Sequence, residues 1–274
     1  MKAQFSFVVS KSQSGGDLLE ILLPAIPYRT SAEWQCLLNG GLIEVNSKVV
    51  KQDMALNEGD CVQYLIPDHE EGHVDTNWSI LWENEDIAAI HKPANLPVSR
   101  TTRNVYNTLI QLLRRESPWP DAHLLHRLDL ETSGIILIGK TKSAAVKFQP
   151  VINQFIKRKV YLAWVHGAPG WTSLQYECDL NTLKDSEIRC QMYKVSSGEG
   201  KFSKTHFNVI QKLGGYSLVQ CELKTGRKHQ IRAHLSSLGH PIVGDKIYSN
   251  GGEFYLKRLN DSLETTDHER LLTD

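Results

Sequence analysis

The first 66 residues alternate between apolar and polar positions in a way that predicts a small α/β unit. Residues 31–38 have helical spacing, and Thr30 and Glu33 stand at the two positions of a capping box. The following strands are expected over residues 42–46, 48–50 and 61–66. We therefore predict a separate N-terminal domain over residues 1–66.

The segment from Pro67 to Asp86 carries seven acidic residues and neither Lys nor Arg. It contains Pro and Gly, so its start, residues 67–77, is interpreted as an exposed acidic linker. A second domain is predicted over residues 78–274, with a helix at 107–115 and another from Thr141 to about residue 155. Strands are expected from residue 78 and over 87–90, 133–139, 160–165, 205–210 and 216–223. Many strands with few helices favour an α+β domain built on a mixed, largely antiparallel sheet.

Composition narrows the class of protein only modestly. The chain has 274 residues, of which 41% are hydrophobic, so a sizeable core can be buried. No apolar run approaches the roughly 20 residues of a membrane span, and the N-terminus does not resemble a secretion signal. The five cysteines form no Cys-x-x-Cys pair, which argues against a metal cluster or disulfide framework and favours a reducing cytoplasm.

Charge is distributed unevenly along a chain whose net charge is zero. Residues 87–252 carry 23 Lys and Arg against 11 Asp and Glu, a net charge of +12. The other residues carry the balancing −12. This asymmetry favours a polyanionic partner for the middle of the chain, although an ordinary mixed surface gives the same counts.

Three polar segments are candidates for chemistry. Residues 126–134 place Arg127 and Asp129 just before a predicted buried strand, where catalytic groups are common. Residues 223–235 predict a turn and a helix in which Arg232 borders the apolar stripe and requires an anionic partner. Residues 157–167 combine a basic cluster with Tyr161, on which a nucleic-acid base can stack. Taken singly, the first segment is most often a capped turn with a surface ion pair. A basic, solvated helix face competes as the interpretation of the second, and a core or edge tyrosine is the commoner one for Tyr161.

In order, these segments resemble the RluA-type pseudouridine synthases. The motifs are H-R-L-D-x-x-T-S-G, K-x-Y-x-A-x-V-x-G and L-x-T-G-R-x-H-Q-I-R-x-H-L, at residues 126–134, 159–167 and 223–235. Two further segments, residues 91–98 and 239–248, are similar to the family's upstream and downstream segments. The resemblance covers about residues 80–248, and five motifs in order are far more specific than one.

The resemblance implies a role for individual residues. Asp129 matches the catalytic aspartate, Tyr161 the tyrosine that packs against the target base, and Arg232 the arginine that pairs with the aspartate. Arg127 matches an arginine involved in opening the RNA. We add as substrate-binding candidates Lys159, Arg227, Lys228, His229 and Gln230. The family needs no metal or organic cofactor, and we expect an RNA partner, no membrane, no obligatory protein partner and a monomer.

The expected reaction detaches uracil from its sugar, turns it, and rejoins it through carbon 5. Breaking the glycosidic bond develops positive charge at the sugar, as in glycoside hydrolysis. An ionised Asp129 can stabilise that charge, attack the sugar or take a proton, and the sequence leaves these three roles open. Burial alone raises the pKa of a carboxyl group, and a neighbouring arginine opposes that effect.

Both ends of the chain depart from the pattern. Residues 1–66 loosely resemble an S-four-like RNA-binding domain through Tyr28-Arg29-Thr30, residues 39–46 and Glu58-Gly59-Asp60, yet they contain more acidic than basic residues. The family's Leu-His-Ala segment and final strand are not found after Tyr248. Either the core tolerates their loss or the chain is truncated at its C-terminus.

Three functions are therefore weighed. The first is isomerisation of uridine in RNA, with ribosomal RNA favoured over transfer RNA by analogy with enzymes that carry an S-four-like domain. The second is an RNA chaperone that has kept the fold and lost turnover. The third treats Asp129 and Glu131 as a glycosidase carboxylate pair, which leaves the two basic segments unexplained.

Overall fold

The structure, a computed structural model, describes residues 3–24, 29–67, 69–101, 103–260 and 262–273. The chain divides into two compact units, residues 1–152 and 153–274. Every strand pair formed by the described residues is antiparallel, so the α+β class is confirmed. The parallel pairing expected of a mixed sheet does not occur among these residues, whose strands form three separate sheets.

The N-terminal sheet has the strand order β1-β4-β2-β3. Its elements are β1 (Ala3–Val8), α1 (Leu18–Leu22), α2 (Ser31–Asn39), β2 (Ile43–Val45), β3 (Lys48–Val50) and β4 (Cys61–Ile66). The capping box is confirmed, since Thr30 Oγ1 accepts from Glu33 N and the Glu33 carboxylate accepts from Thr30 N. Trp34 is fully buried and its ring packs edge-on against Tyr64 at 5.0 Å between centroids. The S-four-like identity stays a prediction, and Tyr28 lies outside the described residues.

The acidic linker predicted over residues 67–77 is held to the rest of its unit through the buried side chain of Glu71. The side chain of Glu71 is only 2% exposed. Its carboxylate accepts three backbone hydrogen bonds, from Val105 N and Tyr106 N at 2.6 Å and from Asn107 N at 2.8 Å. Burial alone raises the pKa of this carboxyl group, but the three N–H donors outweigh burial and hold it below its ordinary value. The prediction of an exposed linker is therefore wrong for Glu71, because backbone N–H groups take the place of water around its carboxylate.

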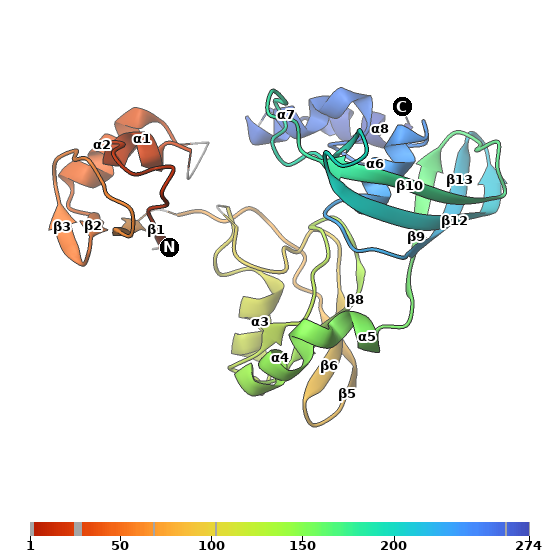
Figure 1. The fold of residues 1–274 in the computed structure, drawn as a ribbon, viewed down its shortest axis with the longest axis horizontal. Helices are drawn as coiled ribbons and strands as arrows, with labels where there is room; N and C mark the ends of the chain where they lie inside the picture. Colours follow the sequence, from red (N-terminus) through yellow and green to blue (C-terminus); the bar gives the residue numbers. More distant parts are fainter. Residues whose placement is uncertain (1–2, 25–28, 68, 102, 261, 274) are drawn as a thin grey trace. The chain divides into compact units, whose positions relative to one another are not determined.

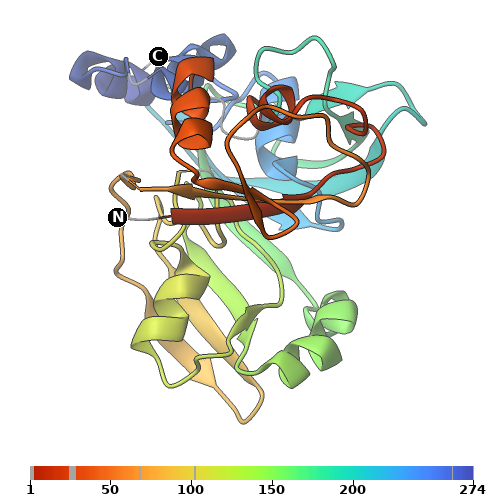
Figure 2. The same ribbon diagram turned by 90° about the vertical axis from the view of Figure 1, so that its left-hand side faces the viewer.

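The second sheet also belongs to residues 1–152 and has the order β5-β6-β8-β7. Its strands are β5 (Ser79–Glu83), β6 (Ile87–Lys92), β7 (His123–Leu124) and β8 (Gly134–Gly139). Helices α3 (Leu109–Glu116) and α4 (Lys142–Phe148) lie against this sheet (Figures 1 and 2). The single helix predicted from Thr141 to residue 155 is interrupted by a 3₁₀ turn (Gln149–Val151) before α5 (Ile152–Phe155). Pro150 explains this break, because proline lacks the N–H that continues an α-helix.

Residues 153–274 are built on a five-stranded sheet of order β11-β10-β12-β13-β9. The strands are β9 (Lys159–His166), β10 (Ser173–Asn181), β11 (Tyr193–Val195), β12 (Lys201–Leu213) and β13 (Tyr216–Leu223). Helix α6 (Gln230–Ser237) covers one face, where Leu235 packs into the buried cluster of Val165, Phe207 and Val219. After α6 come α7 (Glu253–Leu259) and α8 (Thr265–Thr273), which bury Phe254 and Leu271.

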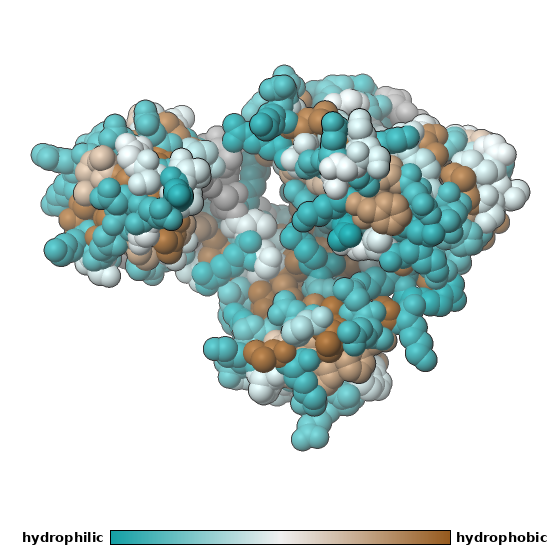
Figure 3. All heavy atoms as spheres, in the orientation of Figure 1, coloured by the Kyte–Doolittle hydropathy of each residue, from teal (hydrophilic) through white to brown (hydrophobic). Residues whose placement is uncertain are grey.

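The surface agrees with the composition of the chain. Hydrophilic residues cover most of the face seen in Figure 3, and apolar residues appear in scattered patches between them. Among the described helices, none has both the length and the hydropathy that a membrane span requires.

Candidate active site

Asp129 lies in the loop that joins β7 to β8, as predicted from its place before a buried strand. Its side chain is half-buried, and the Asp129 carbonyl accepts a 3.2 Å hydrogen bond from Thr132 N, which closes a tight turn. Arg127 is exposed on the same loop. The other end of the loop is tied to β8, since Leu137 N donates to His126 Nε2 at 3.0 Å.

Lys92 supports this loop from below, a role that the sequence did not reveal. This last residue of β6 is fully buried, and its Nζ donates to three carbonyl oxygens: Pro93 at 2.7 Å, Leu96 at 2.9 Å and Leu130 at 3.1 Å. The third bond fixes the residue that follows Asp129. Burial lowers the pKa of Lys92 to about 8, although the nearby Glu131 and Asp129 carboxylates favour its charged form. Lys92 belongs to the upstream motif, which signalled the family but not this contact.

The low pKa of Lys92 predicts a specific pH dependence of stability. The unfolded chain keeps this proton up to about pH 10.5, whereas the folded protein releases it near pH 8. Between these values the unfolded state binds more protons, so stability rises with pH. The free energy of unfolding of the wild type relative to Lys92→Met should grow by on the order of 3 kcal/mol from pH 8 to pH 10.5. Urea unfolding of both proteins across this range measures it, and a constant difference would contradict it.

Tyr161 and Lys159 share one face of β9, as the alternation of the strand predicted. Tyr161 is half-buried and packs against the cluster beneath α6. Lys159 Nζ donates to Asn153 Oδ1 at 2.7 Å, and partial burial lowers the pKa of Lys159. The shared strand face that the sequence predicted for Lys159 and Tyr161 is therefore present at the start of this strand.

The loop between β13 and α6 carries three of the predicted substrate-binding residues, and the fourth, Gln230, begins α6. Arg227 and Lys228 are exposed, whereas His229 adopts a left-handed conformation (φ 52°) and its Nδ1 lies 3.2 Å from the Tyr248 hydroxyl. Gln230 is buried, and its side-chain amide forms hydrogen bonds only to other groups of the protein among the described residues. Its Oε1 accepts from Thr225 Oγ1 and Arg227 N, and its Nε2 donates to Lys204 O and Thr205 Oγ1. Because all four bonding positions are occupied, Gln230 shapes the loop in this conformation rather than facing a ligand.

Arg232 has the anionic partner that its position required. Its Nε and Nη2 donate to the two carboxylate oxygens of Asp245, at 2.6 Å and 2.8 Å. The side chains are 17% and 4% exposed, so this two-point ion pair is largely shielded from water. The guanidinium also lies over the Tyr248 ring, 5.0 Å from its centroid. Asp245 is a site residue that the sequence analysis missed.

Asp245 is held ionised by this arrangement. Burial alone raises the pKa of its carboxyl group, but the bonds from Arg232 and from Ile247 N and Tyr248 N outweigh burial and lower it. Oδ1 accepts from these two backbone groups at 2.9 Å and 3.1 Å. Asp245 therefore fixes both Arg232 and the chain that follows it.

The predicted catalytic residues divide between the two compact units. Asp129 and Arg127 belong to residues 1–152, whereas Tyr161, Arg232 and the remaining candidates belong to residues 153–274. The direct pairing of Arg232 with Asp129 stays a prediction. The structure does show what holds two of the three catalytic candidates: Lys92 bonds to Leu130, the residue after Asp129, and Asp245 pairs with Arg232.

Comparison with known proteins identifies the class to which this fold and site belong. Residues 86–237, more than half of the chain, match the family model of RNA pseudouridylate synthase. The chain belongs to this family and is by family a pseudouridine synthase, an isomerase. The similarity to large-subunit ribosomal enzymes confirms the RluA-type resemblance. Ribosomal large subunit pseudouridine synthase D of Zymomonas mobilis is 31% identical over 225 residues, which cover 77% of this chain and 70% of the relative.

Two further matches extend this result. The mitochondrial tRNA pseudouridine(32) synthase of Saccharomyces cerevisiae is 29% identical over 85% of this chain, which spans 50% of that relative's length. The solved structure of human RNA Pseudouridylate Synthase Domain Containing 1 has a TM-score of 0.56 and 27% identity. It covers 68% of this chain and 75% of its own. The family's fold is therefore shared, and relatives named for ribosomal and for transfer RNA are both similar to this chain.

Proposed function

We propose that the chain converts uridine to pseudouridine in structured RNA, with Asp129 as the catalytic carboxylate. The observation that carries this proposal is the half-buried position of Asp129 on a loop fixed by the buried Lys92, inside the segment that matches the family. A rigid, partly dehydrated carboxylate suits a reaction that must exclude water from a reactive sugar.

The reaction breaks the bond between N1 of uracil and C1′ of ribose and forms a bond between C5 and C1′. The C5 hydrogen leaves as a proton and N1 gains one, so the product is an isomer of the substrate. An ionised Asp129 can stabilise the positive charge on the sugar, attack C1′ or abstract a sugar proton. Each role requires the carboxylate rather than the neutral acid.

The other candidates have complementary roles in this proposal. Tyr161 offers an apolar face to the target base and one hydroxyl, so it excludes water without adding charge. Arg232, oriented by Asp245, is proposed as the arginine that this family uses beside its catalytic aspartate. Arg127, exposed on the same loop as Asp129, contacts the RNA while the uridine leaves its stack, a step that costs a few kcal/mol.

For the substrate we propose ribosomal rather than transfer RNA. The N-terminal α/β domain and the likeness to a ribosomal large subunit enzyme support this choice, while the likeness to a mitochondrial tRNA enzyme supports the alternative. We further propose that the protein acts as a cytoplasmic monomer.

Tritium release from RNA labelled at carbon 5 of uridine tests the activity, because isomerisation frees that hydrogen. We expect release from ribosomal RNA lacking pseudouridine, followed by mapping of the modified position. Release from transfer RNA alone would reassign the substrate. RNA binding without release would favour the chaperone, and free uracil as a product would favour a glycosidase.

A further inference from the structure

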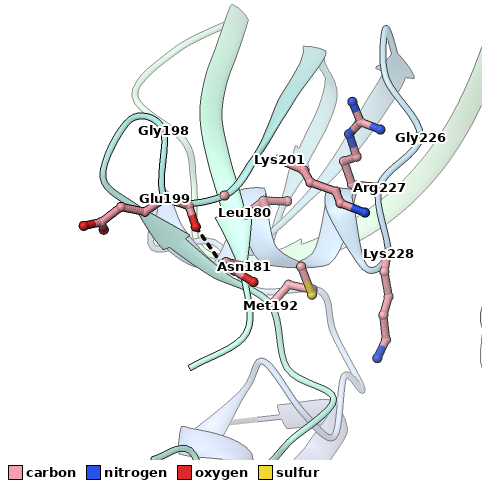
Figure 4. A pocket seen from close by; sticks show the side chains of 10 residues that line it. Leu180, Asn181, Met192, Gly198, Glu199, Lys201, Gly226, Arg227 and Lys228 are labelled. Atoms are coloured by element: carbon pink, nitrogen blue, oxygen red, sulfur yellow. Dashed lines mark hydrogen bonds between the residues drawn. The ribbon is translucent and has the colours of Figure 1, made fainter. Parts of the chain in front are cut away.

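A basic groove opens on the five-stranded sheet, apart from Tyr161 and Arg232. Its cavity of about 550 Å³ is formed by the end of β10, the segment that enters β12, and the loop before α6. We call it the basic groove and define it by Lys201, Arg227, Lys228, Asn181 and Met192, which Figure 4 shows among its lining residues. Only Arg227 and Lys228 were candidates from sequence.

The cations of the basic groove are available to a ligand. Lys201, Arg227 and Lys228 are all exposed. Within the described part of the chain, the Lys201 and Lys228 ammonium groups form neither an ion pair nor a hydrogen bond. Arg227 uses its Nε on Phe202 O at 2.9 Å, which holds the side chain along the groove. Glu199 also lines the cavity, but its side chain points away from the three cations in Figure 4.

Beside its cations, the basic groove has an apolar floor and a polar edge, so it can contact more of a ligand than a phosphate group. Leu180, which is fully buried, and the half-buried Met192 supply an apolar floor, and Asn181 adds an amide at its edge. Two hydrogen bonds fix the Asn181 amide. Its Nδ2 donates to Glu199 O at 2.7 Å, and its Oδ1 accepts from Thr182 N. Gly200 cannot carry a side chain, because a Cβ would lie 2.8 Å from Leu180 O.

The basic groove continues toward β9, the strand that carries Lys159 and Tyr161. A Cβ built on Gly226, which lines the groove, would lie 4.0 Å from Lys159 Nζ on β9. Lys159 is two residues from Tyr161, so cations run from the proposed base-binding tyrosine to the groove within one compact unit. A polyanion that follows this line passes Lys159 in addition to the three cations of the groove.

We infer that the basic groove binds a single-stranded nucleotide of the RNA substrate next to the target uridine, with its phosphate at Lys201 and Lys228 and its base over Met192. This inference rests on the proposed function and names where the flanking RNA lies. RNA loops present splayed nucleotides of this kind, and positively charged grooves follow their backbone. The groove does not select a base, because an apolar floor accepts any base face.

The test measures RNA binding without turnover. The probe is a fluorescein-labelled 16-nucleotide RNA of mixed A and C, which is single-stranded and contains no uridine. We expect K201A/K228A to bind about tenfold more weakly and the slope of log affinity against log salt to fall by ~0.7, since both lysines contact one phosphate and each neutralised phosphate contributes ~0.7 in single strands. The matched control is K212A, which removes a cation from the far end of the same strand, where Lys212 Nζ donates to Pro169 O.

Each outcome has a defined meaning. Equal affinity of K201A/K228A and K212A would overturn the inference, and so would ATP binding that is lost in K201A/K228A while RNA binding is unchanged. Thermal unfolding checks both proteins, and K201Q/K228Q replaces the alanine variant if that variant is less stable. Where wild type isomerises uridine, the groove variant should raise KM and leave kcat unchanged. If wild type shows no isomerisation but the binding difference stands, only the proposed function fails.

Discussion

Asp129→Asn should reduce pseudouridine formation by about 10⁴-fold or more, because every role open to this residue requires a negative charge. Asn has nearly the same shape and keeps the backbone carbonyl that accepts from Thr132 N, so the turn should form as in wild type. Loss of activity will then reflect the charge and not the fold. Tritium release gives the rate, and circular dichroism and binding of the uridine-free RNA show that the protein remains folded and competent to bind.

Glu131→Gln is the matched control for Asp129→Asn. Glu131 is an exposed carboxylate on the same loop, and like Asp129 it favours the charged form of Lys92. We expect the control to retain activity within tenfold of wild type. Comparable losses in both variants would support the paired carboxylates of a glycosidase. Near-normal activity in Asp129→Asn would remove Asp129 from the mechanism.

Local signals in the sequence predicted local structure well. The capping box at Thr30 and Glu33 and the alternation over residues 216–223 both depend on neighbours a few residues away, and the structure confirms both. The family resemblance is confirmed over residues 86–237. It was visible in the sequence because its motifs are short and follow one another in a fixed order. The broken helix after Thr141 could have been read from Pro150, which helical spacing alone ignores.

Long-range partners could not be predicted in this way. Glu71 appeared as one acid in an exposed run, yet it binds backbone N–H groups 34 to 36 residues away. Lys92 was identified only as one position of the upstream motif, yet its ammonium group donates a hydrogen bond to Leu130 O. Arg232 clearly required an anion, but only tertiary structure selects Asp245 from the 31 acidic residues of the chain. Pairing across the fold decides these contacts, and a single sequence contains no record of pairing.

Asp245→Asn should destabilise the protein by about 3 kcal/mol, because it leaves the Arg232 guanidinium shielded from water without its counter-charge. The loss should depend on pH. The pKa of Asp245 is lowered in the folded state, so its contribution is complete above the unfolded pKa and disappears as pH falls through the folded value. The difference in unfolding free energy between wild type and Asp245→Asn should therefore be largest near neutral pH and shrink in acid. Pseudouridine formation should also fall, since Arg232 loses the two-point partner that orients it.

Urea unfolding at pH 7 and in moderate acid measures this effect, with Asp86→Asn as the control. Asp86 pairs with Lys147 at 2.8 Å, but the two side chains are 38% and 65% exposed, so the loss should stay below about 1 kcal/mol at either pH. Equal losses of unfolding free energy for Asp86→Asn and Asp245→Asn would contradict the prediction. They would mean that water solvates Arg232 as well as it solvates a surface cation. A large, pH-dependent loss confined to Asp245→Asn would instead establish that Arg232 depends on a buried anion within its own unit. Arg232 would then be oriented by a partner within its own unit and independently of Asp129.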